Sequence, residues 1–315
     1  MSARILIEDR LSAGGDLAEE VREGLTRPLR ELPPKLFYDA AGSELFDRIC
    51  ELPEYYPTRC EREILDRRAL EIVRGVDELV ELGSGSATKT RVLLATGAIR
   101  RYVPVDVSPT VVERCAEELC DLYDGLEVRG LIGDFHRDLE HLPDGDHRLF
   151  AFLGGTVGNL HPEQRAGFLA MLRELMGPDD RLLLGTDLVK DRAVLEAAYD
   201  DSQGVTAAFN RNALRVLNRE LDADFDPDAF EHIAFYDEVN SWIEMRLRSR
   251  RRQAVRIDAA DLDLELAPGE DIRTEISTKF TPARVELELA GAGLELDELW
   301  TDSAGRFALS LSSPG

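Results

Sequence analysis

The stretch VELGSGSATKT, residues 80–90, joins the end of an apolar run to a glycine turn and the start of a helical pattern. Glycine permits a tight turn and lets the backbone approach a ligand closely. The third glycine of a dinucleotide fingerprint is missing, because Thr88 occupies its position. A pyrophosphate needs the full fingerprint, so this departure favours S-adenosylmethionine, which has no phosphate, over NAD.

Strand-like and helical segments alternate on the carboxyl side of this turn. Strand patterns occur at residues 101–109, 126–135, 148–160 and 180–189, separated by helical stretches. This alternation predicts an α/β fold with a parallel sheet covered on both faces. The continuous apolar runs LFAFL and LLLG are typical of strands buried on both sides.

After Val189 the alternation stops. A helical stretch is followed by strand patterns, and Ile243, Met245 and Leu247 alternate with polar residues as in a half-buried antiparallel sheet. The α/β pattern returns near residue 280, with a helix and a terminal hairpin that turns at 303–305. We therefore predict two domains: a Rossmann-like domain from residues 60–189 and 280–315, and a substrate-binding α+β domain from residues 8–59 and 190–279.

Composition limits the classes of partner. The chain has 315 residues and a formal net charge of −24, which disfavours nucleic acid. It lacks an apolar run of about 18 residues and a secretory pattern at its start, so we expect a cytoplasmic monomer without a membrane partner. The four cysteines are expected to be free thiols, and the five histidines lack metal-site spacing, so no metal is expected.

Four residues after the glycine turn are candidates for cofactor contacts. Asp106 ends the second strand pattern, where a carboxylate can accept hydrogen bonds from ribose hydroxyls, or can cap the next helix. Asp134 and Phe135 end the third, and could hold an adenine or simply terminate the strand. Lys89 could meet the carboxylate of the methionyl group or be solvated.

The chain resembles the histidine-specific Nα-methyltransferases of ergothioneine biosynthesis. The resemblance spans nearly the whole chain in order, through LPPKLFYDAAGSELFD, LPEYYPTR, LVELGSGSATKTR, FLGGTVGNL, LLLGTDLVKD, AYDDSQGVTAAFNRN, WIEMRLR, TEISTKF and WTDSAGRFALSL. It implies a class I methyltransferase fold, S-adenosylmethionine as co-substrate, and three methylations of histidine to hercynine. The family's glycine turn often continues differently from Ser86–Thr88, which leaves the fine contacts of that turn open.

The same resemblance implies roles for individual residues. Those matching the family's cofactor contacts are Gly83, Lys89, Asp106, Asp134 and Phe135. Those matching its contacts to the substrate carboxylate and amine are Asn159 and Tyr199. Those matching its imidazole site are Tyr55, Glu275 and Ser277, with Met245 lining it. Those matching the wall around the amino group are Tyr38, Phe46, Gly154 and Thr156.

Simple chemistry supports several of these roles. Glu275 and Ser277 are two apart on a strand pattern, so they share a face and could address the two nitrogens of one imidazole, although a surface pair is the alternative. Asn159 offers both a donor and an acceptor. Tyr38 or a water could assist loss of the amine proton, and no other residue is an obvious strong base, so Tyr38 and Asn159 are the expected catalytic residues.

Two other functions remain open at this point. One is a related enzyme acting on another amino acid, such as a tryptophan derivative; the other is a non-catalytic module that binds S-adenosylmethionine. The run from Arg248 to Arg252 resembles a phosphate patch, but in so acidic a chain we expect it to be a solvated turn between strands.

Overall fold

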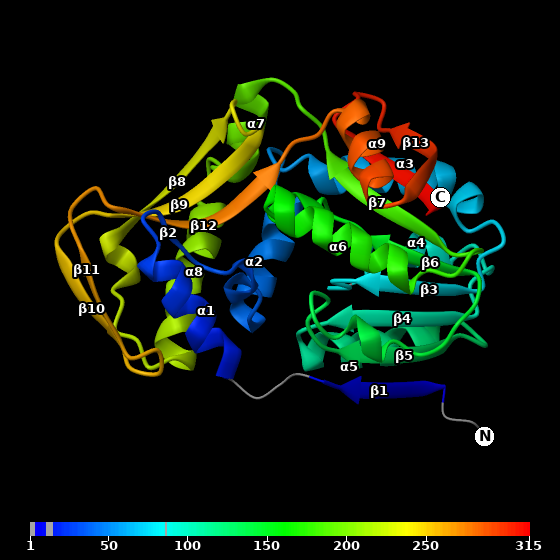
Figure 1. Ribbon diagram of the computed structural model, residues 1–315, viewed down its shortest axis with the longest axis horizontal. Helices are drawn as coiled ribbons and strands as arrows, with labels where there is room; N and C mark the ends of the chain where they lie inside the picture. The colour runs from blue at the N-terminus through cyan, green and yellow to red at the C-terminus, as the bar shows by residue number, and fades with distance from the viewer. Residues whose placement is uncertain (1–3, 11–14, 86) are drawn as a thin grey trace. The chain divides into compact units, whose positions relative to one another are not determined.

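The structure is a computed structural model that describes residues 4–10, 15–85 and 87–315 (Figure 1). Ser86, where the glycine turn departs from the family pattern, lies outside the described residues. The chain divides into two compact units, which are described separately. The first comprises Met1–Leu11, Pro57–Val189 and Phe280–Gly315, and the second comprises Ser12–Tyr56 and Lys190–Lys279.

A single sheet forms the centre of the first unit. Its strands are β1 Ile5–Asp9, β3 Glu78–Leu82, β4 Arg101–Asp106, β5 Glu127–Ile132, β6 Arg148–Phe152, β7 Arg181–Asp187, β13 Leu294–Thr301 and β14 Phe307–Pro314. They lie in the order β1-β5-β4-β3-β6-β7-β14-β13. The pairs among β5, β4, β3, β6 and β7 are all parallel, as predicted. All five residues of β3 are buried, and these include the two glutamates Glu78 and Glu81 as well as three apolar residues.

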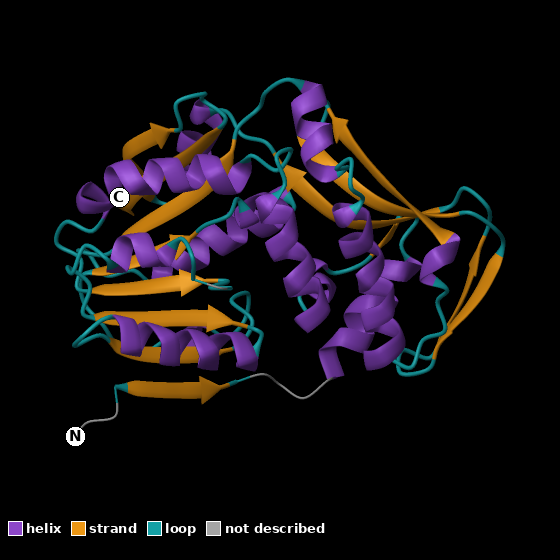
Figure 2. Cartoon of the chain, turned by 180° about the vertical axis from the view of Figure 1, so that it is seen from behind, coloured by secondary structure: helices purple, strands orange, loops and turns teal. Residues whose placement is uncertain are grey.

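Helices cover both faces of this sheet (Figure 2). They are α3 Pro57–Ile72, α4 Thr90–Leu94, α5 Pro109–Leu122, α6 Pro162–Leu175 and α9 Pro282–Gly291, with the short 3-10 helices η2 Leu139–His141 and η3 Thr156–Asn159. On one face, Phe168 of α6 and Leu289 of α9 join a buried cluster with Val80, Val103 and Phe150. The glycine turn therefore leaves the middle of a well-packed sheet, so its position is set by the core.

The terminal hairpin closes the sheet, as the sequence predicts. Strand β14 pairs antiparallel with β7, where Phe307 lies opposite Asp187, and β13 forms the outer edge. At the other edge lies a strand that the sequence analysis missed: β1 runs parallel to β5 from Ile5. Residues 8 and 9, which we predicted to begin the substrate-binding domain, therefore belong to the first unit. An edge strand needs few apolar residues, and ILIED was too short to stand out.

The second unit holds a four-stranded and a two-stranded sheet. The strands are β2 Arg30–Glu31, β8 Phe230–Asp237, β9 Trp242–Ser249, β10 Gln253–Ile257, β11 Leu262–Leu266 and β12 Asp271–Thr278. The helices are α1 Gly15–Thr26, α2 Ala40–Glu51, α7 Arg192–Tyr199 and α8 Val205–Glu220, with η1 Pro34–Phe37 and η4 Pro227–Ala229. The larger sheet has the order β2-β12-β9-β8, and β10 pairs with β11. Its pairs β8–β9 and β9–β12 are antiparallel, as expected from the alternation in SWIEMRLR.

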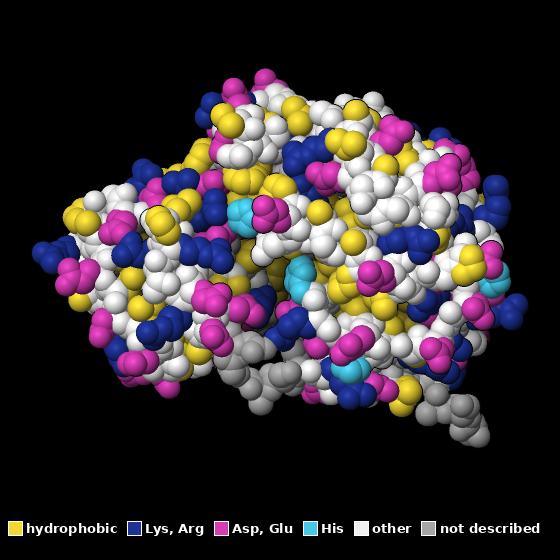
Figure 3. Space-filling view, viewed as in Figure 1, with side chains coloured by type: hydrophobic (Ala, Val, Ile, Leu, Met, Phe, Trp, Pro, Cys, Tyr) yellow, Lys and Arg dark blue, Asp and Glu magenta, His cyan; other side chains and the backbone are white. Residues whose placement is uncertain are grey.

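Acidic and basic side chains are interspersed on the face drawn in Figure 3. In the arginine run, Arg251 pairs with Asp226 and Arg252 with Glu265, and both are largely exposed. This agrees with a charged turn between strands. All four cysteines are free thiols. Within the described part of the chain, no helix is both long and apolar enough to cross a membrane.

Candidate active site

The glycine turn at the end of β3 is tied to Asp106 at the end of β4. Gly83 and Gly85 have φ angles of 70° and 49°, in the left-handed region that favours glycine. Asp106 Oδ2 accepts a hydrogen bond from Gly85 N at 3.0 Å, and Oδ1 accepts one from Ser108 N at 3.0 Å. Ser108, not Asp106, is the N-cap residue of α5. Burial raises the pKa of Asp106, and these backbone bonds oppose the shift.

Phe135 brings an aromatic ring to the same turn. A Cβ placed on Gly83 would lie 3.8 Å from this ring, and among the described residues that are not its chain neighbours none lies within 4 Å of a Cβ on Gly85. The inner side of the ring packs on Phe152, with centroids 5.2 Å apart. Asp134 accepts a hydrogen bond from His136 N at 2.9 Å, so it shapes its own turn. The ring and the glycine backbone thus border open space beside the turn.

Lys89 is not simply solvated. It forms an ion pair with Glu61 of α3, whose side chain is fully buried, and Glu61 also accepts a hydrogen bond from Gly154 N at 2.8 Å. A Cβ on Gly154 would lie 3.2 Å from Lys89 Nζ and 3.4 Å from Thr156 Oγ1. The predicted residues Lys89, Gly154 and Thr156 therefore lie together around Glu61, which sequence reasoning missed.

A second buried carboxylate supports the turn from beneath. Tyr102 donates to Glu81 at 2.5 Å, and both side chains are buried. Burial raises the pKa of Glu81 to about 7, and the hydrogen bond from Tyr102 opposes the shift. Glu81 therefore links β3 to β4 directly below the glycines. Asn159, the last residue of η3, is half-buried in the same unit.

These residues fit adenosylmethionine better than a phosphate ligand. A carboxylate has about four acceptor sites, so Asp106 can still accept from two ribose hydroxyls after binding the two backbone N–H groups. The buried Ser84 Oγ has no hydrogen-bond partner among the described residues. The open glycine backbone and the Phe135 ring suit a flat base.

In the second unit, Glu275 and Ser277 lie on one face of β12, as predicted. Across the sheet Glu275 lies opposite Met245, and Ser277 lies opposite Ile243. Glu275 is 8% exposed, and its carboxylate has neither a hydrogen bond nor an ion pair with any described residue. Burial raises its pKa to about 7, although nearby Lys279 opposes the shift. Burying a carboxylate without a hydrogen-bond partner costs free energy, so a hydrogen-bond donor on a ligand would bind favourably here.

Lys279 joins two of the predicted substrate residues. Its Nζ donates to Tyr199 Oη at 3.0 Å and to Ser277 Oγ at 2.9 Å, and those two hydroxyls are 2.8 Å apart. The lysine is fully buried and lies 4.6 Å from the centre of the Tyr199 ring. Sequence reasoning missed Lys279, although its spacing of two residues from Ser277 was a signal.

A chain of aromatic rings leads away from Tyr199. Tyr55 lies 6.2 Å from Tyr199, Phe46 lies 6.2 Å from Tyr55, and Tyr38 lies 5.9 Å from Phe46, between ring centres. Phe209 of α8 contacts Tyr38 at 6.0 Å. Burial raises the pKa of Tyr55 well above its usual value, with further contributions from neighbours that include Glu275. Tyr38, Phe46 and Tyr55 are thus gathered as predicted.

His232 on β8 fixes the backbone of Tyr199. Its Nε2 lies 2.8 Å from the Tyr199 carbonyl oxygen, and its Nδ1 lies 2.8 Å from Asn210 Nδ2. A carbonyl accepts and an amide nitrogen donates, so the ring is neutral with its proton on Nε2. Burial lowers the pKa of His232, which favours that neutral form.

The structure thus gathers the predicted residues into two sets. The first unit holds the proposed cofactor residues Gly83, Lys89, Asp106, Asp134 and Phe135, with Gly154, Thr156 and Asn159. The second unit holds the proposed substrate residues Tyr38, Phe46, Tyr55, Tyr199, Met245, Glu275 and Ser277.

The parallel sheet with its terminal antiparallel hairpin defines a class I, Rossmann-like methyltransferase. A solved structure of the mitomycin 7-O-methyltransferase MmcR is similar, with a TM-score of 0.50 and 15% sequence identity, covering 89% of this chain and 59% of that one. This similarity concerns the fold alone.

Sequence comparison makes the assignment more specific. The family described as histidine-specific, SAM-dependent methyltransferase matches residues 17–314. The histidine N-alpha-methyltransferase of Mycobacterium tuberculosis (strain CDC 1551 / Oshkosh) is 52% identical over 303 residues, covering 94% of each chain. That of Mycolicibacterium smegmatis (strain ATCC 700084 / mc(2)155) is 52% identical over 307 residues, covering 96% of each. The chain belongs to the histidine-specific, SAM-dependent methyltransferases.

Proposed function

We propose that this enzyme transfers methyl groups from S-adenosylmethionine to the α-amino nitrogen of L-histidine, three times, to form hercynine for ergothioneine biosynthesis. The observation that carries the choice of histidine is the buried carboxylate of Glu275, which shares a strand face with Ser277. An imidazole offers an N–H to the carboxylate and a second nitrogen to the hydroxyl. An apolar amino acid would leave the carboxylate buried and unpaired.

In this proposal the first unit binds the methyl donor. Asp106 accepts from the ribose hydroxyls, Asp134 and Phe135 hold the adenine, and the backbone at Gly83 and the Lys89 ammonium serve the methionyl part. S-Adenosylmethionine supplies an electrophilic methyl group on a sulfonium. Gly154 and Thr156 lie beside Lys89, which suits a wall near the reacting amine.

The remaining residues align the acceptor. Tyr55, Glu275 and Ser277 bind the imidazole beside Met245, while Tyr199 and Asn159 hold the carboxylate and amine. In each cycle a neutral amine forms an N–C bond as the C–S bond breaks, and S-adenosylhomocysteine leaves. Tyr38 or a water assists the loss of the amine proton to solvent, and the faces of Tyr38, Tyr55 and Phe46 stabilise the growing cation. Most of the acceleration comes from alignment of nucleophile, methyl and sulfur.

Turnover with free amino acids tests this function. Purified enzyme is incubated with S-adenosylmethionine and each proteinogenic amino acid, and products are read by mass spectrometry. We expect histidine alone to gain three methyl groups, with mono- and dimethyl species appearing first. Methylation of tryptophan in place of histidine would transfer the assignment to the related enzymes. Calorimetric binding of the donor without histidine binding or turnover would favour a non-catalytic module.

Other aspects of the proposal follow from composition. We propose a cytoplasmic monomer with no metal or membrane partner, and with no nucleic-acid partner because the net charge of −24 repels phosphate backbones. Light scattering of the purified protein tests the monomer, and a mass twice that of the chain would contradict it.

A further inference from the structure

Strand β12 changes which side chains it presents to each face partway along its length. Arg273 lies opposite Arg246 of β9, but the next pair is Glu275 opposite Met245. Two residues of β12 therefore span one step of β9, and Thr274 is the extra residue of a β-bulge. A bulge of this kind re-aims the side chains that follow it.

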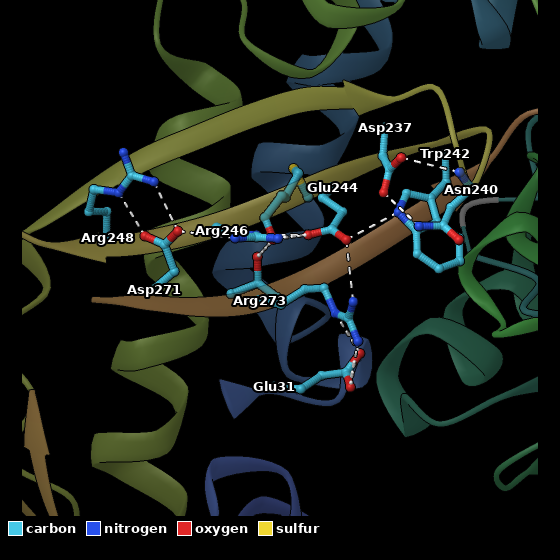
Figure 4. Close-up of polar contacts among 11 residues, drawn as sticks. Glu31, Asp237, Asn240, Trp242, Glu244, Arg246, Arg248, Asp271 and Arg273 are labelled. Carbon is cyan, nitrogen blue, oxygen red and sulfur yellow. Dashed lines mark hydrogen bonds and ion pairs between the residues drawn. The ribbon is translucent and has the colours of Figure 1, made fainter. Parts of the chain in front are cut away.

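Before the bulge, the odd-numbered residues of β12 lie on the face drawn in Figure 4. Arg248 binds Asp271 at 2.7 Å on this face, and Arg273 binds Glu31 at 3.1 Å. After the bulge, Glu275 and Ser277 share the opposite face with Met245 and Ile243. The bulge thus moves the proposed imidazole pair from the ion-paired face to the face that Tyr199 contacts.

The hydroxyl of Thr274 holds the bulge. Thr274 Oγ1 donates to the Met245 carbonyl oxygen at 3.0 Å, and the side chain is 1% exposed. Met245 is the residue opposite Glu275, so the bond fastens the bulge to the step of β9 where the register changes. Loss of this donor would leave a buried carbonyl less well satisfied.

The charges on the other face disfavour a straight strand. Without the bulge, the register of Arg273 with Arg246 would continue and place Glu275 opposite Glu244. Glu244 is 3% exposed and already accepts from Trp242 at 3.1 Å and from Arg246 at 2.5 Å (Figure 4). Two carboxylates directly opposite each other on a sheet repel. The bond from Thr274 and the repulsion that a straight strand would create between Glu275 and Glu244 therefore both favour the bulged register.

We propose that Thr274 is a positioning residue that determines specificity for imidazole, because its bulge turns Glu275 and Ser277 toward the substrate. The inference rests on the proposed function. It assigns the recognition of histidine to a backbone irregularity as well as to the two side chains that contact the ring.

Two substitutions that differ in the hydroxyl test the role. Thr274→Val removes the donor and keeps the β-branched shape, whereas Thr274→Ser keeps the donor. We expect Thr274→Val to raise the KM for histidine about tenfold or more, corresponding to one unsatisfied buried carbonyl. The ratio of kcat/KM for histidine over phenylalanine should fall with it. Thr274→Ser should restore both values to within about twofold of wild type, as should the core-trimming control Ile272→Val.

Binding of S-adenosylhomocysteine by calorimetry shows whether each variant is folded, and its Kd should stay within about twofold of wild type because that unit is untouched. If Thr274→Val does not fold, Thr274→Ala, which also lacks the hydroxyl, is compared with Thr274→Ser in its place. An unchanged histidine KM and discrimination ratio in the folded Val or Ala variant would overturn the inference. Failure of the wild type to methylate histidine would instead overturn the proposed function.

Discussion

The carboxylates of Glu61, Glu81 and Glu275 are buried and that of Asp106 is partly buried, yet the surroundings of Glu275 differ from those of the other three. Glu61 is paired with Lys89, Glu81 is bonded to Tyr102, and Asp106 accepts two backbone N–H groups. Glu275 is left without such a bond among the described residues. A satisfied carboxylate holds the chain in place, whereas an unsatisfied one reduces stability and is available to a ligand.

Glu244 and Glu275 show the same contrast between a paired and an unpaired carboxylate within a single sheet. Glu244 lies on β9, one residue from Met245, and like Glu275 it is buried, at 3% against 8% exposed. Its carboxylate is bound by Trp242, Arg246 and Arg273 at 2.5–3.3 Å. Two arginines therefore bind the structural carboxylate of Glu244 directly, whereas Glu275 has the ammonium of Lys279 nearby without a direct hydrogen bond to it.

The largest effect is expected from Asp106→Ala, which removes the carboxylate that we propose binds the ribose of the cofactor. Loss of two charge-assisted acceptors for the ribose hydroxyls should weaken binding of S-adenosylhomocysteine about 1,000-fold, and methyl transfer should fall in parallel. Titration calorimetry and single-turnover rates measure both. Asp106→Asn, which keeps the shape and one acceptor oxygen, should lie between. An Ala variant with wild-type affinity would show that Asp106 only shapes the turn.

A smaller loss of binding, with a gain in stability, is expected from Glu275→Gln. Histidine affinity should fall about 30-fold because a charge-assisted bond becomes a neutral one, while cofactor affinity stays unchanged. The matched substitution Glu244→Gln should destabilise the protein instead, since its partners are arginines. Equal loss of both ligands in Glu275→Gln would make Glu275 structural.

The stability gain has a defined pH dependence. The pKa of Glu275 is raised from its usual 4.5 to about 7, so between these values the folded state binds more protons than the unfolded state and stability falls as pH rises. Without histidine, Glu275→Gln should be more stable than wild type above pH 7, by at most about 3 kcal/mol, and equal to it near pH 4. Urea denaturation at several pH values measures the difference. A constant difference across this range would contradict the assignment.

Lys279→Met should have the smallest effect of the three. The Tyr199 and Ser277 hydroxyls can still bond to each other, so we expect the KM for histidine to rise about tenfold with little change in kcat. Lys279 also lowers the pKa of Glu275, so its loss should move the acidic limb of the kcat/KM profile to higher pH. Lys279→Arg should keep the limb in place. A rise in the KM for histidine without any shift of the acidic limb of the kcat/KM profile would mean that Lys279 contributes packing and does not affect the charge of Glu275.

Much of the first unit could be predicted from local patterns. The glycine turn, Asp106 and Asp134-Phe135 each lie at or just after the carboxyl end of a strand, and the carboxyl ends of parallel strands meet at one edge of a sheet. Strand β1 was missed because five residues at an edge carry little periodic signal. Glu61 was missed because α3 reads as an ordinary charged helix, and only packing brings it to Lys89 and Gly154.

The sequence by itself determined the alternation of strands and helices, the adenosylmethionine-type turn and the family, because each depends on residues close together in the chain. It also put Glu275 and Ser277 on a common face. Only the tertiary structure decided which face that is, since Thr274 adds a bulge whose position depends on pairing with β9, about 30 residues away. The pairing of Lys279 with Tyr199 has the same origin: it joins residues 80 positions apart, which only packing could bring together.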